Sequence, residues 1–147
     1  MTDDRRERLA ELLREDRRKK ARPSIVKQWA ELGVSISPIA DGRHKWLADR
    51  QSSGLSWSLD FVPDYVATVE EFVAAYDMVA IAGWDLMEEP ACLVTAHDLS
   101  LAARKLVDLY PDGFIVADSS FRRVLGVDWD EDQKVAYAGI FEQEKNA

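Results

Sequence analysis

The sequence predicts an α+β fold, in which a mainly antiparallel sheet carries helices packed on one face. Two local patterns support this prediction: residues 3–21 are rich in helix-forming Arg, Glu, Leu and Lys, and residues 55–61 alternate between apolar and polar side chains. A third observation is the C-terminal part of the chain, where three strand-like segments are separated by polar turns, as in a meander. With 147 residues, of which 47% are apolar and 31% charged, the chain is expected to bury a sizeable core.

The first 22 residues are predicted to be a charged helical arm, placed before a single α+β domain of residues 23–147. The arm holds nine Lys/Arg and six Asp/Glu residues, and its apolar stripe consists only of Leu9, Leu12 and Leu13. Because this stripe is too narrow to bury a helix well, we expect the arm to lie on the surface or to project. We also expect it to be dispensable for folding.

Pro23 is expected to end this first helix, because proline removes a helix hydrogen bond and clashes with the preceding turn. A second helix is expected from Ile25 to Leu32, and Gly33 is placed to terminate it. Val34 and Ile36 then suggest a short strand.

Pro38 should end that short strand. The clearest strand of the chain is expected at residues 55–61, and Pro63 should stop it. The apolar side chains of this second strand alternate with serine and aspartate, so one of its faces should be buried and the other wet. The residues expected to point into the core are Leu55, Trp57, Leu59 and Phe61.

The central part of the chain is predicted to alternate between helices and short buried strands. Thr68 has capping-box spacing to Glu71 and is expected to open a helix that runs to about Tyr76. Strands are expected at Met78 to Ala82 and at residues 92–95, joined by a loop from Gly83 to Pro90. Asp98 or Ser100 is then expected to cap a helix whose inward residues are Leu99, Ala102, Ala103, Leu106, Val107 and Tyr110.

A turn at Pro111-Asp112-Gly113 leads into the predicted C-terminal meander. Its three strands are expected at Phe114–Asp118, Arg122–Asp128 and Val135–Phe141. The connection between the last two is polar, as a hairpin loop should be.

Charge is distributed unevenly along the chain, whose formal net charge is −8. Residues 51–103 contain no lysine and no arginine, where the overall composition would place about seven, and they carry nine carboxylates. Unpaired carboxylates on a folded surface repel one another, and a basic partner relieves that repulsion. This pattern predicts an acidic face that binds a basic protein, such as a toxin or a nucleic-acid-binding protein. Acidity that serves only solubility is the alternative.

Two tryptophans beside carboxylates are the best candidates for a binding site on that face. Trp84 lies in the loop that ends at Pro90, and Trp129 lies at the tip of the last hairpin. Tryptophan with acidic neighbours is typical of an interface that receives Arg or Lys, although both rings could instead fold back onto the core. The predicted partner-binding residues are Trp84, Asp85, Leu86, Glu88, Glu89, Trp129, Asp130 and Asp132.

No catalytic, metal or cofactor motif is recognisable in the sequence. Cys92 is the single cysteine, and the two histidines, His44 and His97, are too few for a histidine-only zinc site. The hairpin tip has the alternating aspartates of a calcium loop but lacks its glycine and its final glutamate. We predict no metal, no cofactor and no membrane partner, and the net charge of −8 disfavours direct nucleic-acid binding.

Three hypotheses for the function remain. The first is a non-catalytic acidic protein that masks a basic site on a partner; its most specific form is a bacterial immunity or inhibitor protein that neutralises a cationic toxin such as a nuclease. The second is an intracellular adaptor or assembly subunit that docks its N-terminal helix onto a partner or a second copy. The third is an enzyme that uses carboxylates. A charged N-terminus and the lack of a long apolar run lead us to expect a cytoplasmic protein.

The surface should discriminate among these hypotheses. A continuous acidic patch with an exposed tryptophan would favour the inhibitor. An exposed stripe of Leu9, Leu12 and Leu13 would favour the adaptor, and a deep pocket that gathers His97 with carboxylates would favour the enzyme.

Overall fold

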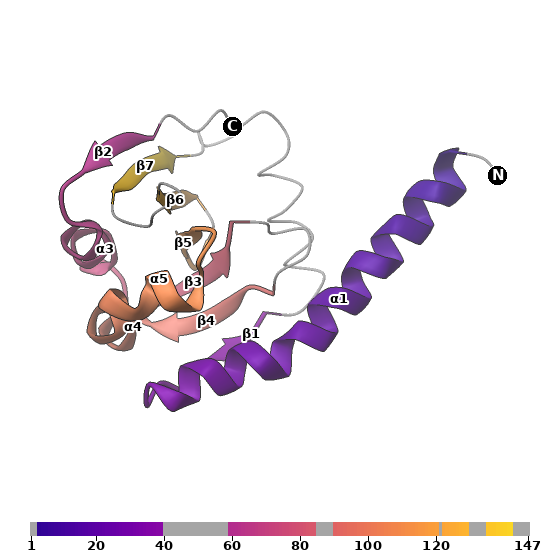
Figure 1. The fold of residues 1–147 in the computed structure, drawn as a ribbon, viewed down its shortest axis with the longest axis horizontal. Helices are drawn as coiled ribbons and strands as arrows, with labels where there is room; N and C mark the ends of the chain where they lie inside the picture. The colour runs from indigo at the N-terminus through magenta and orange to yellow at the C-terminus, as the bar shows by residue number, and fades with distance from the viewer. Residues whose placement is uncertain (1–2, 40–58, 85–89, 121, 130–134, 143–147) are drawn as a thin grey trace.

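The computed structural model of the chain describes residues 3–39, 59–84, 90–120, 122–129 and 135–142 (Figure 1). Within these ranges seven strands form one antiparallel sheet in the order β1-β4-β3-β5-β6-β7-β2. The predicted α+β class with a C-terminal meander is therefore confirmed. The strands are β1 (Ser37–Pro38), β2 (Asp60–Val62), β3 (Met78–Gly83), β4 (Cys92–Thr95), β5 (Phe114–Asp118), β6 (Arg123–Trp129) and β7 (Ala136–Glu142).

The helices lie around the sheet in two groups (Figure 1). One long N-terminal helix passes along the β1 end, and shorter helical segments pack on a sheet face. They are α1 (Asp3–Glu31), α3 (Tyr65–Val73), α4 (Ala96–Ala102), the 3₁₀ turn η1 (Ala103–Lys105) and α5 (Leu106–Leu109).

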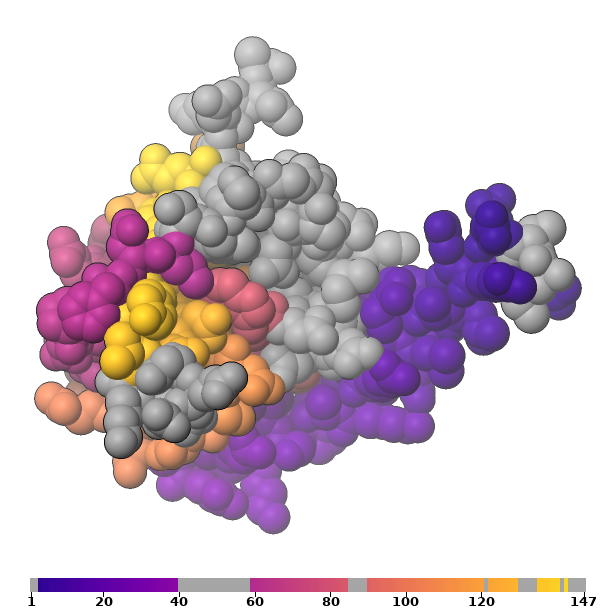
Figure 2. Space-filling view, turned by 45° about the horizontal axis from the view of Figure 1, so that its top comes forward, coloured from indigo at the N-terminus to yellow at the C-terminus, as the bar shows by residue number. Residues whose placement is uncertain are grey.

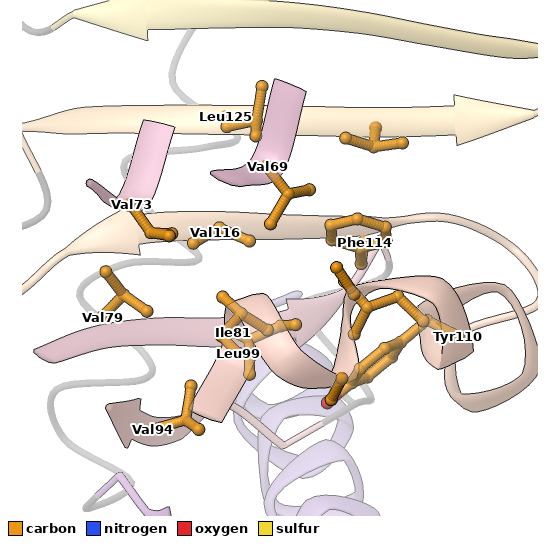
Figure 3. Packing of buried hydrophobic residues seen from close by; sticks show 14 of the residues in the cluster. Val69, Val73, Val79, Ile81, Val94, Leu99, Tyr110, Phe114, Val116 and Leu125 are labelled. Carbon is orange, nitrogen blue, oxygen red and sulfur yellow. The ribbon is translucent and has the colours of Figure 1, made fainter. Parts of the chain in front are cut away.

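The main hydrophobic core lies between these helices and one face of the sheet (Figure 3). Successive strand residues point to opposite faces, so Val79 and Ile81 of β3 join the main core, whereas Ala80 and Ala82 belong to a second cluster on the other face. The sheet is thus buried on both sides. This explains why β3 reads as a continuous apolar run.

Pro23 does not end a helix, contrary to the prediction. α1 continues through it to Glu31 as one 29-residue helix. The lost backbone hydrogen bond is offset by contacts after the proline, because Ile25 and Trp29 are buried in the main core. Gly33 ends the helix as predicted, with a φ of 79° that side-chain-bearing residues rarely adopt.

Two edge strands also differ from the predictions. β1 contains Pro38 instead of ending before it, and proline is tolerated there because its partner β4 lies on one side only. In β2, Phe61 is 62% exposed and does not point into the core. The predicted alternation is not seen across β2, because Asp60 and Phe61 are both exposed. Val62 packs against the core, Leu59 is half-buried, and the Phe61 ring contacts the Tyr137 ring at 6.5 Å. Leu55 and Trp57 lie outside the described residues.

Both central helices begin earlier than predicted, because their caps are different residues. Asp64 caps α3 by accepting a hydrogen bond from Val66 N at 3.0 Å, and Thr68 lies within the first turns. Thr95 caps α4 by accepting from Asp98 N at 3.1 Å, so neither Asp98 nor Ser100 is the cap. In each case the capping oxygen belongs to the last residue before the helix, as helix ends require.

The strand predictions from Met78 onward are confirmed, with ends that shift by one residue. β6 and β7 pair in register, with Gly126 opposite Gly139. The turn before β5 is also confirmed. Gly113 has a φ of 99°, and an added Cβ there would lie 2.8 Å from Val127 O, so both backbone conformation and space require glycine.

Candidate protein-binding surfaces

The structure describes two of the eight predicted partner-binding residues, Trp84 and Trp129. The other six lie outside the described residues: Asp85, Leu86, Glu88, Glu89, Asp130 and Asp132. Their role in binding therefore stays a prediction.

Trp129 is half-buried and packs inside the molecule. Its ring lies 5.7 Å from the rings of both Phe114 and Tyr65, and its Nε1 donates a hydrogen bond to Pro111 O. The same ring lines a hollow of about 330 Å³ together with Asp64, Tyr65 and Arg104. Trp129 thus helps to hold the β6 end against α3, and only part of its ring can reach a partner.

Trp84 is also half-buried. Its ring packs against the second hydrophobic cluster, and its backbone N donates to Gly113 O at 3.1 Å. This position supports a structural role for the ring and leaves part of its surface accessible. Neither tryptophan is the fully exposed anchor that the inhibitor hypothesis would favour.

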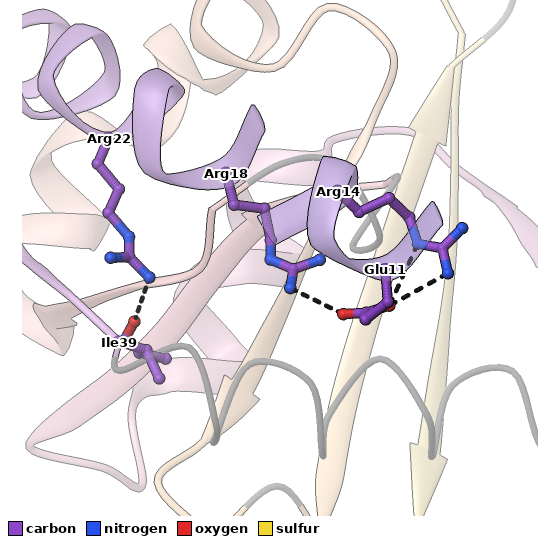
Figure 4. A network of polar contacts seen from close by, with 5 residues as sticks. All are labelled: Glu11, Arg14, Arg18, Arg22 and Ile39. Atoms are coloured by element: carbon purple, nitrogen blue, oxygen red, sulfur yellow. Dashed lines mark hydrogen bonds and ion pairs between the residues drawn. The ribbon is translucent and has the colours of Figure 1, made fainter. Parts of the chain in front are cut away.

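The inward side of α1 is polar over its central turns (Figure 4). Glu11 accepts hydrogen bonds from Arg14 at 3.1 Å and from Arg18 at 3.2 Å, and Arg22 donates to Ile39 O at 3.3 Å. Arg18 is only 1% exposed. Burial alone would raise the pKa of Glu11, but the hydrogen bonds and charges of Arg18 and Arg14 outweigh it and lower that pKa.

The outward side of α1 carries the three leucines. Leu9, Leu12 and Leu13 are 51%, 56% and 52% exposed. At about 100° per residue, their mean direction lies roughly 170° around the helix from Arg18. In its N-terminal half, the helix therefore has the reverse of the usual amphipathic orientation: charged residues face the body and leucines face away from it.

Cations flank these leucines on both sides. Arg5 and Arg6 precede them, Lys19 and Lys20 follow them, and all four side chains are exposed. The exposed Asp16 lies in the same direction and pairs with Lys20 at 2.7 Å. We call this surface the leucine face: Arg5, Arg6, Leu9, Leu12, Leu13, Asp16, Lys19 and Lys20. It lies toward the indigo end of α1, which marks one extremity of the molecule (Figure 2).

A second surface lies at the other extremity, where α3, β3 and α4 meet (Figure 1). α3 packs against α4, Asp77 O accepts a hydrogen bond from Ala96 N at 2.8 Å, and Met78 pairs with Thr95. These contacts bring exposed or half-exposed carboxylates together with apolar side chains. We call this surface the acidic corner: Glu70, Glu71, Asp77, Met78, Asp98 and Leu101.

The acidic corner has apolar content as well as charge, since Met78 is 40% and Leu101 is 72% exposed. Three cations border this corner, and Arg104 and Lys105 among them are exposed and follow Leu101 by about one helical turn. Arg123 stacks over the Phe72 ring at 5.2 Å and pairs with Glu142 at 3.2 Å. Arg104 and Lys105 follow α4 in η1, close to the N-terminal end of α3, where Tyr65 OH donates to Arg104 O.

Catalytic residues are not brought together within the described parts of the chain. Cys92 is fully buried, and burial raises the pKa of its thiol to about 11 despite the opposing charge of Arg22. His97 is exposed on α4 and does not line the hollow beside Trp129. In these same parts, no group of three or more His, Cys, Asp or Glu residues is placed to hold a metal ion, and no helix has the length and apolarity to cross a membrane. His44 lies outside them.

Comparison with known proteins gave no matching family model, no matching curated protein and no matching solved structure. The function is therefore argued from these two surfaces.

Sequence reasoning identified the leucines but not the acidic corner. The signal for the corner was the absence of Lys and Arg from residues 51–103. That signal covers many carboxylates equally, and only the packing of α3 against α4 singles out those that share one surface.

Proposed function

We propose that this protein is a non-catalytic adaptor or assembly subunit that docks onto another protein through the leucine face of α1. The observation that carries the proposal is the exposure of all three leucines by half or more, on the side of the helix that faces away from the body. An exposed apolar stripe at helical spacing is what a helix presents to a receiving groove.

The inward side of α1 supports the same proposal. Arg18 is buried and Arg22 donates to Ile39 O, so this side holds the helix against the body, whereas the pairs of Glu11 lie within α1 itself. A rigidly held helix loses little conformational freedom when it binds, which favours docking. Within the described part of the chain, the three leucines are not buried against the body as Arg18 is, so packing does not explain their positions.

Site-specific photocrosslinking in the native host would test this proposal. A photoreactive residue at Leu12 should form a discrete adduct with one protein, and the same residue at Ser24, exposed in the second half of α1, should not. Adding Leu9→Ser and Leu13→Ser should abolish the adduct. Equal labelling from both positions, or a Leu12 adduct that survives the serine substitutions, would contradict docking through this face.

The acidic inhibitor remains a second candidate, and the acidic corner is the observation that favours it. Four carboxylates with two exposed apolar side chains form a surface suited to a basic partner, and acidic complementarity chiefly speeds association. On this hypothesis, Glu70→Lys with Glu71→Lys should slow association with a captured cationic toxin. It should also flatten the salt dependence of that rate. An unchanged association rate would show that the acidic corner is not the surface that binds the toxin.

A further inference from the structure

We infer that the leucine face of one copy docks on the acidic corner of a second copy, so that the chain assembles head to tail. This inference rests on the proposed function and names the partner as another molecule of the same protein. Its basis is complementarity between two surfaces that the structure shows on one molecule.

Charge is the first element of this complementarity. The leucine face carries four exposed cations and one carboxylate, Asp16, which is already paired with Lys20. The acidic corner carries four carboxylates and lies in the stretch without Lys or Arg. Opposite patches of this kind attract one another and align the two surfaces.

Apolar surface is the second element. Leu9, Leu12 and Leu13 project between the two pairs of cations on α1. On the acidic corner, Leu101 and Met78 are exposed, and the carboxylates come from α3, from α4 and from the turn before β3. Each surface thus has an apolar centre with a charged rim, which is the usual arrangement of a protein interface.

The same charges favour a heterologous contact over pairing of two α1 helices. In a parallel pair each cation would meet its own counterpart, which destabilises the pair. An antiparallel pair centred on the leucines would place Arg6 of one copy opposite Asp16 of the other, but Asp16 is the one carboxylate of the leucine face and already pairs with Lys20. The acidic corner offers four carboxylates to the same cations.

The positions of the two surfaces determine the form of the assembly. The leucine face lies near one extremity of the molecule and the acidic corner near the other (Figures 1 and 2). A head-to-tail contact leaves one free surface of each kind, so growth continues unless the rotation closes a ring. The two surfaces comprise eight and six residues, fewer than the roughly 20–30 residues a side of a stable interface, so association should be weak and concentration-dependent.

Sedimentation velocity and light scattering of the full chain test the inference, from roughly 10 µM to 1 mM, the range of weak association. The average mass should rise past that of two chains. Two variants change exposed residues only: Leu9→Ser/Leu12→Ser removes the leucine face, and Glu70→Lys/Glu71→Lys reverses the acidic corner. Each variant alone should remain monomeric. The control Lys27→Glu, also exposed on α1, should assemble as the unaltered chain does.

Mixing the two variants gives the decisive result. The mixture has one intact leucine face and one intact acidic corner, so it should form a species of two chains and stop there. A monomeric unaltered chain at 1 mM, a closed dimer that the variants do not disrupt, or a mixture without complex would overturn the inference. If the unaltered chain is monomeric while the Leu12 crosslink to another protein persists, head-to-tail pairing fails and the proposed docking function stands.

Discussion

Trp29 and Tyr110 connect α1 to the end of α5 through buried polar atoms. Trp29 is 0% and Tyr110 5% exposed, and Trp29 Nε1 donates to Tyr110 OH at 3.2 Å. The two residues are 81 positions apart, so this bond joins the N-terminal helix to the body of the fold. A buried indole N–H must find an acceptor, because an unsatisfied buried donor is costly.

Tyr110→Phe should therefore destabilise the protein by roughly 1–3 kcal/mol, because it removes the acceptor and keeps the ring. Urea unfolding measures this change. The control Tyr137→Phe alters an exposed tyrosine and should stay within about 0.5 kcal/mol of the unaltered protein. Equal stability of the two variants would show that the Trp29–Tyr110 bond contributes nothing.

Glu11 gives the fold a pH-dependent contribution. Its folded pKa is lowered from the ordinary value, so the ionised carboxylate stabilises the folded state above that ordinary value. The stabilisation is lost as the pH falls through the lowered folded pKa, where Glu11 becomes protonated. Glu11→Gln is neutral at every pH and lacks this contribution throughout.

Glu11→Gln should accordingly cost about 1 kcal/mol near neutral pH, as expected for a half-buried ion pair, and nothing at acidic pH. Unfolding free energies measured from pH 7 down to about 3, below the ordinary pKa of glutamate, would show the difference shrinking. Glu7→Gln removes an exposed carboxylate from the same side of α1 and serves as the control; at neutral pH it should cost less than about 0.5 kcal/mol. A difference that persists at low pH would assign the effect to packing.

At the scale of elements, the sequence predicts best those strands and turns that depend only on residues close together in the chain. β3 to β7 were foreseen because apolar runs and turns such as Pro111-Asp112-Gly113 are local signals. The exposure of Phe61 in β2 was not foreseen, because it goes with a contact to Tyr137, which lies 76 residues later in the chain. The sequence predicts that the N-terminal helix lies on the surface or projects, but the exposure of its leucines and the burial of Arg18 have no local signal.

The continuity of α1 leads to a prediction at Pro23. Proline inside a helix costs roughly 3 kcal/mol relative to alanine, and tertiary contacts after it hold α1 together. Pro23→Ala should therefore raise the unfolding free energy by about 1–3 kcal/mol and increase helicity by circular dichroism. Ser24→Ala, an exposed neighbour, should change stability by less than about 0.5 kcal/mol. No gain at Pro23 would favour a break between two helices, as first expected from the sequence.

At the scale of the whole molecule, charge is separated along its length. The basic leucine face and the acidic corner lie near opposite extremities, and the sheet with its two hydrophobic clusters lies between them (Figure 1). The proposed domain boundary after Arg22 falls inside α1, between the buried Arg18 and the core residue Ile25. The helix therefore belongs partly to the domain and partly to the projecting arm.

Two deletions should locate where the arm ends. Residues 3–9 are exposed throughout, so removing residues 1–9 should change the unfolding free energy by less than about 0.5 kcal/mol. Removing residues 1–22 also deletes Arg18, whose buried stem packs against the chain, and Arg22, which bonds Ile39 O. This longer deletion should cost roughly 2–3 kcal/mol, measured by thermal and urea unfolding. Equal stability of both deletions would place the boundary after Arg22, as expected from the sequence, and would make the inward arginines of α1 irrelevant to folding.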